Sequence, residues 1–202
     1  QMDELSERHA GRVVGLDPDL RIASGPQIAI TFDDGYADNL AVAAPILAAR
    51  GLPFTVFVTA DFVRKSRPGF LTPSGLRELA ALPKVRIGAH GATHVALSAC
   101  DDMQLREELH SSKQYLEEMI GREVCTMAYP YGAADRRVRD AVAAAGYRLA
   151  ASSYAQVNDA RRDRLMLGRT EVLGGDSLRV FRQKLHGDWD WRHRLTKDPV
   201  GR

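Results

Sequence analysis

Short apolar runs alternate with helical patterns along this 202-residue chain, and that alternation is the strongest constraint on its fold. Runs rich in β-branched and aromatic residues recur at 28–30, 54–58, 85–87, 124–127 and 147–151. Strands separated by helices pair in parallel, because each crossover returns the chain to the same end of the sheet. The pattern therefore predicts an α/β domain with a parallel sheet, and by itself does not choose between a barrel and a doubly wound sheet.

The helical stretches between these runs have recognisable ends. Gly51 and Gly121 each follow the last residue of an apolar pattern, as C-terminal caps do. Ser98 is expected to open the longest helix, with Asp101 as its partner in a capping box. Pro45 has to lie early in its helix or kink it. The expected helices span 39–50, 74–82, 98–120, 136–145 and 177–185.

Composition argues against several classes of protein. The chain has 28 basic and 26 acidic residues, a net charge of +2, and no concentrated basic face, so a nucleic-acid partner is not expected. No run approaches the roughly 18 apolar residues of a transmembrane segment. Residues 1–12 are polar and charged rather than a signal peptide, which favours a cytoplasmic location. The sequence does not indicate an oligomeric state.

Two adjacent carboxylates, Asp33 and Asp34, follow the first of these apolar runs in the segment Thr-Phe-Asp-Asp-Gly, residues 31–35. Like charges this close resist ionising together, and a bound cation relieves that cost. One carboxylate can then ligate the metal while the other stays free as a base. Asp-Asp-Gly is also common in solvated turns, so this segment alone leaves both interpretations open.

Two histidines four residues apart, His90 and His94, follow the run 85–87 and a glycine. This spacing would put both imidazoles on one side of a helical turn, within reach of one ion. A carboxylate and two imidazoles make a three-ligand set that leaves positions open for water and substrate. A His-x-x-x-His pair alone is weak, but together with paired carboxylates at another strand end it predicts a metal site.

These two motifs together resemble the signature of the NodB-like polysaccharide deacetylases, carbohydrate esterase family 4. A third segment, Ala-Tyr-Pro-Tyr-Gly at 128–132, supports the resemblance, since the family usually has Arg-x-Pro-Tyr-Gly there. The resemblance implies a distorted (β/α) barrel of NodB-homology type with about seven parallel strands. The expected division is an N-terminal lead-in segment at 1–26, a catalytic domain at 27–186 and a C-terminal tail at 187–202.

The resemblance also implies roles for the matching residues. Asp34, His90 and His94 correspond to the metal ligands, and Asp33 corresponds to the general base that deprotonates a metal-bound water. The backbone N–H of Tyr131 corresponds to an oxyanion donor. The expected cofactor is one divalent metal, with Zn²⁺ as the default and Co²⁺, Ni²⁺, Fe²⁺ or Mn²⁺ as alternatives. The remaining motif residues expected to bind substrate are Tyr129, Pro130 and Gly132.

The chain departs from the family pattern at three positions. The arginine that in relatives braces the base is Ala128 here, and Arg169 is predicted to supply a guanidinium from a neighbouring strand. Gly91 stands where the family has a Ser or Thr after the first histidine of the His-x-x-x-His motif. The late Leu-x-His motif, source of the general acid, has its nearest counterpart at Leu185-His186, so His186 is the candidate acid.

The expected function is a metal-dependent de-N-acetylase that hydrolyses the acetamide of an N-acetylated sugar in a glycan or glycolipid precursor and releases acetate. One alternative is O-deacetylation of an ester by the same site. Another is a carbohydrate-binding member of the fold that has lost activity; the intact Asp33 argues against this, because a binding protein needs no base. The sequence does not choose among peptidoglycan, chitin-like polymers, exopolysaccharides and lipid-linked sugars.

Overall fold

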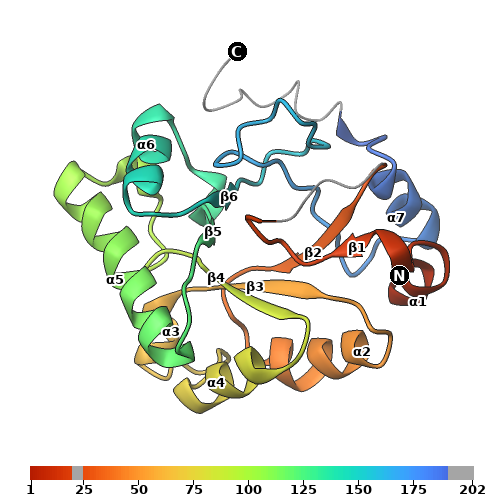
Figure 1. The fold of residues 1–202 in the computed structure, drawn as a ribbon, viewed down its shortest axis with the longest axis horizontal. Coiled ribbons are helices and arrows are strands. Elements are labelled where there is room, and N and C mark those ends of the chain that lie inside the picture. Colours follow the sequence, from red (N-terminus) through yellow and green to blue (C-terminus); the bar gives the residue numbers. More distant parts are fainter. Residues whose placement is uncertain (20–24, 191–202) are drawn as a thin grey trace.

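The centre of the molecule is a sheet of six parallel strands, which lie in space in the same order as along the chain. The computed structural model describes residues 1–19 and 25–190. The sheet curls into part of a barrel wall with helices outside it (Figure 1). The strands are β1 (Val13–Val14), β2 (Ile28–Phe32), β3 (Phe54–Val58), β4 (Val85–Ala89), β5 (Thr126–Ala128) and β6 (Leu149–Ala151).

An irregular segment continues the sheet beyond β6, in the place of a seventh strand. Leu167 forms a parallel bridge with Ala151. The amide of Ser152 donates to the carbonyl of Leu167 at 2.8 Å, and the amide of Leu167 donates to the carbonyl of Ala150 at 2.9 Å. The expected distorted barrel is therefore confirmed, with six regular strands and one bridged segment. This segment leads directly to Arg169.

The helices that the apolar patterns predict are present, with one corrected start, and the structure adds two short helices, at 2–8 and 60–64, that the patterns did not indicate. Asp101, not Ser98, caps α5: its carboxylate accepts the amides of Met103 and Gln104, and the Gln104 side chain completes the capping box. Ser98 lies in the preceding 3₁₀ turn. The helices are α1 (Met2–Arg8), α2 (Ala44–Ala48), α3 (Ala60–Arg64), α4 (Pro73–Ala81), α5 (Asp102–Ile120), α6 (Arg136–Ala144) and α7 (Leu178–Leu185).

Pro45 lies in the first turn of α2, as its fixed φ requires. A π-helical turn at Asn39–Ala43 precedes it. The π-helical turn and α2 together cover residues 39–48 of the helix that the sequence predicts over 39–50.

The lead-in segment contains the short strand β1 and the helix α1, and the sequence pattern did not indicate α1. Leu5 and Val13 are part of the main core. Glu4 forms a two-pronged ion pair with Arg182 of α7, at 2.9 and 2.7 Å, which joins α1 to the last helix. The predicted tail, 187–202, lies outside the described residues beyond position 190.

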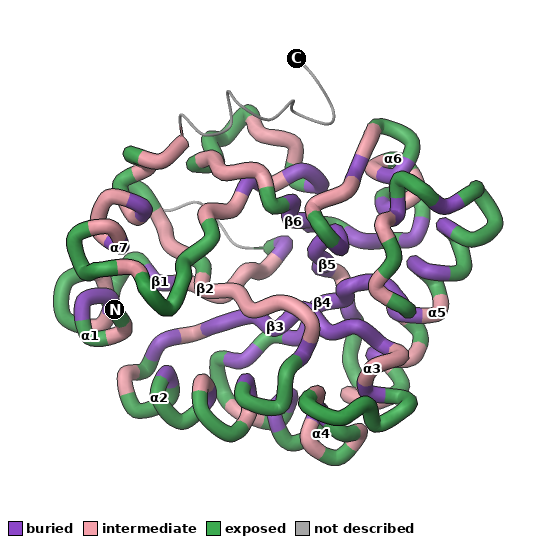
Figure 2. Tube along the Cα trace, turned by 180° about the vertical axis from the view of Figure 1, so that it is seen from behind, coloured by how far each residue is buried: buried purple, intermediate pink, exposed green. Residues whose placement is uncertain are grey.

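The core lies between the sheet and the surrounding helices, where Figure 2 shows the buried positions gathered along the strands. All five residues of β3 are buried, as expected of a central strand covered on both faces. Within residues 1–19 and 25–190, no helix is both long and apolar enough to cross a membrane.

Candidate functional site

The residues with chemical potential gather at the carboxyl ends of the strands, the end of the sheet where such folds place their sites. Asp33 and Asp34 follow β2, and His90 follows β4. Tyr131 follows β5, in the short turn Pro130–Gly132, and Arg169 follows the bridged segment. Because all these strands run in parallel, their ends converge.

Asp34, His90 and His94 form one compact cluster whose potential ligand atoms all lie within 4.8 Å of one another. Asp34 Oδ1 lies 3.0 Å from His94 Nε2 and 3.4 Å from His90 Nε2. This oxygen is buried and has no hydrogen-bond partner among the described residues. A buried carboxylate oxygen without a partner is costly, and a cation among these three donors would satisfy it. The residues therefore fit a divalent metal.

The second nitrogen of each imidazole is held by a neighbour, which leaves Nε2 to face Asp34. His90 Nδ1 lies 2.8 Å from the carbonyl of Ala128, so the nitrogen donates its proton there and Nε2 keeps its lone pair. His94 Nδ1 lies 3.2 Å from the Tyr131 hydroxyl. Burial is the largest influence on the His90 pKa and lowers it, which favours the neutral form that binds metals.

Backbone strain gathers at this cluster. Asp34, His94 and Tyr131 have φ values of 71°, 67° and 60°, in the left-handed region that non-glycine residues rarely adopt. The two imidazoles therefore meet across a loop and not on a helical turn, which corrects the geometry expected from their spacing. Strain of this kind persists where the surrounding structure enforces it, and it is common in functional sites.

Arg169 holds Asp33 in a two-pronged ion pair, as predicted for the guanidinium that replaces the arginine missing at Ala128. Its Nη1 and Nη2 donate to the two carboxylate oxygens at 2.6 and 2.8 Å. Its Nε donates to the Ser152 carbonyl at 3.0 Å, and Nη1 also reaches the Thr31 hydroxyl at 3.2 Å. Burial raises the pKa of Asp33, but the hydrogen bonds and charge of Arg169 outweigh it and leave that pKa below its usual value.

Glu108 supports the loop from His90 to His94, the histidine loop, a role that the sequence analysis missed. Its carboxylate accepts the amides of Ala92 and Thr93, at 2.8 and 3.0 Å, and the Thr93 hydroxyl at 2.5 Å. A signal was present, because Glu108 lies between Leu105 and Leu109 on the buried face of α5. A carboxylate at such a position needs partners.

The same contact explains the glycine that stands where the family has a hydroxyl residue. Gly91 has a φ of +71°, and a Cβ there would lie 3.1 Å from the carboxylate of Glu108. In this chain, the loop hydroxyl that donates to Glu108 belongs to Thr93, two residues after Gly91.

The replacement Glu108→Gln is expected to loosen this loop. The new amide NH₂ would face donors that now bond to oxygen, so unfolding free energy should fall by about 1–3 kcal/mol. Metal affinity should fall by roughly 10- to 100-fold, as when the support of a ligand is lost. Chemical denaturation and metal titration would measure the two effects. Glu107→Gln, at the exposed neighbouring position, is the matched control, and equal behaviour of the two variants would contradict the role of Glu108.

Two residues expected to bind substrate do not reach the surface. Tyr129 is completely buried, and its hydroxyl donates to the Leu165 carbonyl at 2.6 Å. Pro130 is buried as well. Substrate contact by these two side chains is therefore a wrong prediction, because both lie buried in the turn that follows β5. Tyr131 is 70% exposed, and a substrate contact at Gly132 stays a prediction.

His186, the predicted general acid, does not lie with the cluster of Asp34, His90 and His94. It follows the last residue of α7 and lines a cavity of about 450 Å³ together with Glu4, Arg8 and His9 of the N-terminal segment. His9 precedes β1, on the amino-terminal side of the sheet, whereas Asp33 lies at the carboxyl ends. The prediction of His186 as the acid is therefore wrong, because the end of α7 lies beside the N-terminal segment and away from the cluster.

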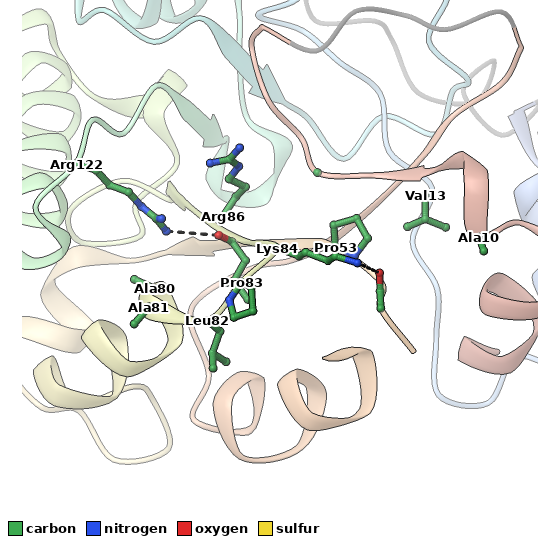
Figure 3. A pocket seen from close by; sticks show the side chains of 13 residues that line it. Ala10, Val13, Pro53, Ala80, Ala81, Leu82, Pro83, Lys84, Arg86 and Arg122 are labelled. Atoms are coloured by element: carbon green, nitrogen blue, oxygen red, sulfur yellow. Dashed lines mark hydrogen bonds between the residues drawn. The ribbon is translucent and has the colours of Figure 1, made fainter. Parts of the chain in front are cut away.

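A larger cavity, of about 680 Å³, also lies away from the cluster, at the amino ends of the strands (Figure 3). Its cations already have partners. Lys84 donates to the Gly51 carbonyl at 2.9 Å and Arg122 to the Val85 carbonyl at 3.4 Å. Arg86 pairs with Asp17 at 2.8 Å. The hollow therefore adds nothing to the site at the other end.

Comparison with known proteins gives the same assignment as the motifs. The family model for polysaccharide deacetylases matches residues 21–150. YxkH of Bacillus subtilis, a protein classed with the polysaccharide deacetylases, is 28% identical over 156 residues, which are 76% of this chain and 54% of YxkH. This chain thus spans about half the length of that relative.

Solved structures show the same fold. The Streptococcus pyogenes deacetylase PplD, in complex with acetate, superposes with a TM-score of 0.82 at 20% identity, over 91% of this chain and 83% of that one. IcaB from Ammonifex degensii gives a TM-score of 0.72 at 22% identity, over 94% and 89%. At such identities the likeness shows the fold, and the sequence match shows the family. The chain belongs to the polysaccharide deacetylase family, a family of carbohydrate-deacetylating hydrolases.

Proposed function

We propose that this protein is a metal-dependent de-N-acetylase that hydrolyses the acetamide of an N-acetylated sugar in a glycan or glycolipid precursor. The observation that carries the proposal is a division of labour between two adjacent carboxylates. Asp34 faces two imidazole nitrogens, while Asp33 is held apart from them by Arg169. A three-donor cluster beside an ionised carboxylate is the equipment that metal-assisted hydrolysis needs.

Asp34, His90 and His94 would hold the metal. Two imidazoles and one carboxylate suit Zn²⁺, and they also accept Co²⁺, Ni²⁺, Fe²⁺ or Mn²⁺. When bound, the metal supplies Lewis-acid activation of a water molecule and of the acetamide carbonyl.

The residues of the chain supply the proton transfers and part of the charge stabilisation. Asp33 takes a proton from the attacking water while Arg169 fixes its orientation. The amide of Tyr131 donates to the developing oxyanion; the hydrogen bonds of its own turn come from the next two amides, Gly132 to Tyr129 and Ala133 to Pro130. With His186 on the far side, Asp33 returns its proton to the leaving nitrogen. The C–N bond breaks, and acetate and a free amine are the products.

The test is acetate release from N-acetylglucosamine oligomers, with the new amine counted in the same samples. Equal amounts of acetate and amine, abolished by a chelator and restored by Zn²⁺, support the proposal. An O-acetylated sugar run in parallel separates ester from amide hydrolysis. Acetate without new amine would contradict de-N-acetylation.

Arg169→Ala is expected to lower kcat by up to about 100-fold, because a base that loses its orientation loses the effect of a fixed geometry. Metal content should stay at the wild-type level, since Arg169 contacts Asp33 and not the three ligands. Arg169→Lys keeps the positive charge but cannot form the bidentate pair with Asp33. Its kcat should lie between those of the wild type and Arg169→Ala. Arg77→Ala, on the exposed side of α4, is the control. Unchanged turnover in Arg169→Ala would refute its positioning role.

A further inference from the structure

A row of aromatic side chains leads from the candidate metal centre to the surface. The ring of Phe62, on α3, lies 5.9 Å from the imidazole of His94. Phe70 lies 4.5 Å from Phe62, and Tyr36 stacks on Phe70 at 4.7 Å with an angle of 22° between the rings. We name Phe62, Phe70 and Tyr36 the aromatic ledge. It runs outward from a ligand side chain, so it is continuous with the site.

Backbone pairing fixes the ledge relative to the cluster. Tyr36 and Phe70 form an antiparallel bridge. On either side of it, the amide of Ala37 donates to the Gly69 carbonyl at 3.0 Å, and the amide of Leu71 donates to the Gly35 carbonyl at 2.9 Å. Gly35 directly follows Asp34. The loop that carries the carboxylates is thus joined to the loop that carries Phe70, and the ledge is a preorganised surface.

The ledge is both accessible and charged. Tyr36 is 45% exposed, although Phe70 lies stacked against its ring. The guanidinium of Arg67 lies 4.3 Å from the ring centre of Phe62 and 5.1 Å from that of Phe70, which are cation–π distances. None of the ion pairs found in the described part of the chain includes Arg67. Its charge is therefore not neutralised by a carboxylate, and N–H donors remain beside an exposed ring.

An exposed aromatic ring next to unneutralised N–H donors suits one kind of ligand. A pyranose ring has an apolar C–H face that can lie on an aromatic ring, and its edge carries oxygens that accept hydrogen bonds. A polymer whose acetylated unit sits at the cluster must pass its next unit over a neighbouring surface. The ledge begins at His94 and is such a surface.

We propose that Tyr36 and Arg67, supported by Phe62 and Phe70, form a subsite for the sugar next to the acetylated one. The ring of that sugar lies on Tyr36, and its oxygen substituents accept hydrogen bonds from Arg67. The inference rests on the proposed function, because it extends the same site along the glycan. It makes the preferred substrate an oligomer or polymer and not a single sugar.

The test compares chain lengths. Dissociation constants of N-acetylglucosamine oligomers of one to five units would be measured on the Zn²⁺-loaded Asp33→Asn protein, with and without Tyr36→Ala. The metal content of each variant would be measured in the same samples, so that damage to the metal cluster is separated from loss of the sugar contact. Tyr36→Ala should weaken binding of the longer oligomers by roughly three- to tenfold, the worth of one aromatic contact, and leave the monomer unaffected. Tyr36→Phe keeps the ring and should keep the affinity, and Arg67→Gln should weaken oligomer binding in the same way. Both Tyr36→Ala and Tyr36→Phe remove the hydroxyl that interacts with Asp34, so the difference between the two variants measures the contribution of the ring.

The outcomes separate this inference from the function on which it rests. If the wild type releases acetate from oligomers but Tyr36→Ala binds them as tightly, the function stands and the subsite is wrong. If no glycan loses acetate but oligomer affinity still depends on Tyr36, the subsite stands and the proposed reaction is wrong. Oligomers that bind no better than the monomer overturn the subsite.

Discussion

Asp34→Ala is expected to abolish metal binding and acetate release together. The carboxylate oxygen of Asp34 lies between the two imidazole nitrogens, and it is buried with no hydrogen-bond partner in the described residues. Removing it leaves two neutral imidazole donors, and the site loses the negative charge that attracts a cation. The loss of metal affinity should exceed the roughly 10- to 100-fold that follows when a residue that merely supports a ligand is removed. His90→Ala and His94→Ala should behave in the same way.

The measurement is the metal content of each purified protein after dialysis against Zn²⁺ at neutral pH, where imidazole is unprotonated. His110→Ala is the matched control, because His110 lies exposed on α5 and outside the cluster. It should retain one metal per chain. A cluster variant that keeps its full metal content would remove that residue from the ligand set.

Asp33→Asn is the second substitution with a large expected effect. It keeps the shape of the side chain but removes the negative charge that accepts a proton, and general-base catalysis is worth roughly 10²- to 10⁴-fold in rate. The two-pronged pair with Arg169 would become a weaker contact with a neutral amide. Metal content should not change. The expected result is a protein that binds metal and glycan but releases acetate at least about 100-fold more slowly.

Asp34→Asn and His186→Ala complete this experiment. Asp34→Asn should lose metal, so the two adjacent substitutions would lower activity for different reasons: one removes the metal and the other removes the base. His186→Ala should keep its turnover across the pH range, because His186 lies beside α1 and not beside Asp33. If Asp33→Asn lost metal while Asp34→Asn kept it, the two carboxylates would have their roles exchanged.

The fold was largely predictable because its elements follow from local patterns. Each strand from β2 to β6 coincides with an apolar run, and the long helix ends at Gly121, whose φ of 67° suits glycine. The first helix was not predictable in this way. Of its seven residues only Met2 and Leu5 are apolar, and it is joined to the fold by an ion pair between Glu4 and Arg182, 178 positions apart. A contact of that range leaves no local pattern.

The sequence alone determined which residues could form a metal site. Asp33, Asp34, His90 and His94 are of the right chemical types, and each follows a strand or lies in the loop after one, so a parallel sheet had to bring them to one end. It also indicated Arg169 as a replacement for the missing arginine, but only because a guanidinium was needed and one lay in a neighbouring apolar run.

The tertiary structure decided what each of these side chains does. It directed Asp34 toward the histidines and Asp33 toward Arg169, a contact between residues 136 positions apart. It buried Tyr129, moved His186 to the opposite end of the sheet, and placed Glu108 beneath the histidine loop. The physical reason is that residue type and strand position depend on the local chain, whereas the direction and partner of a side chain depend on how distant segments pack against it.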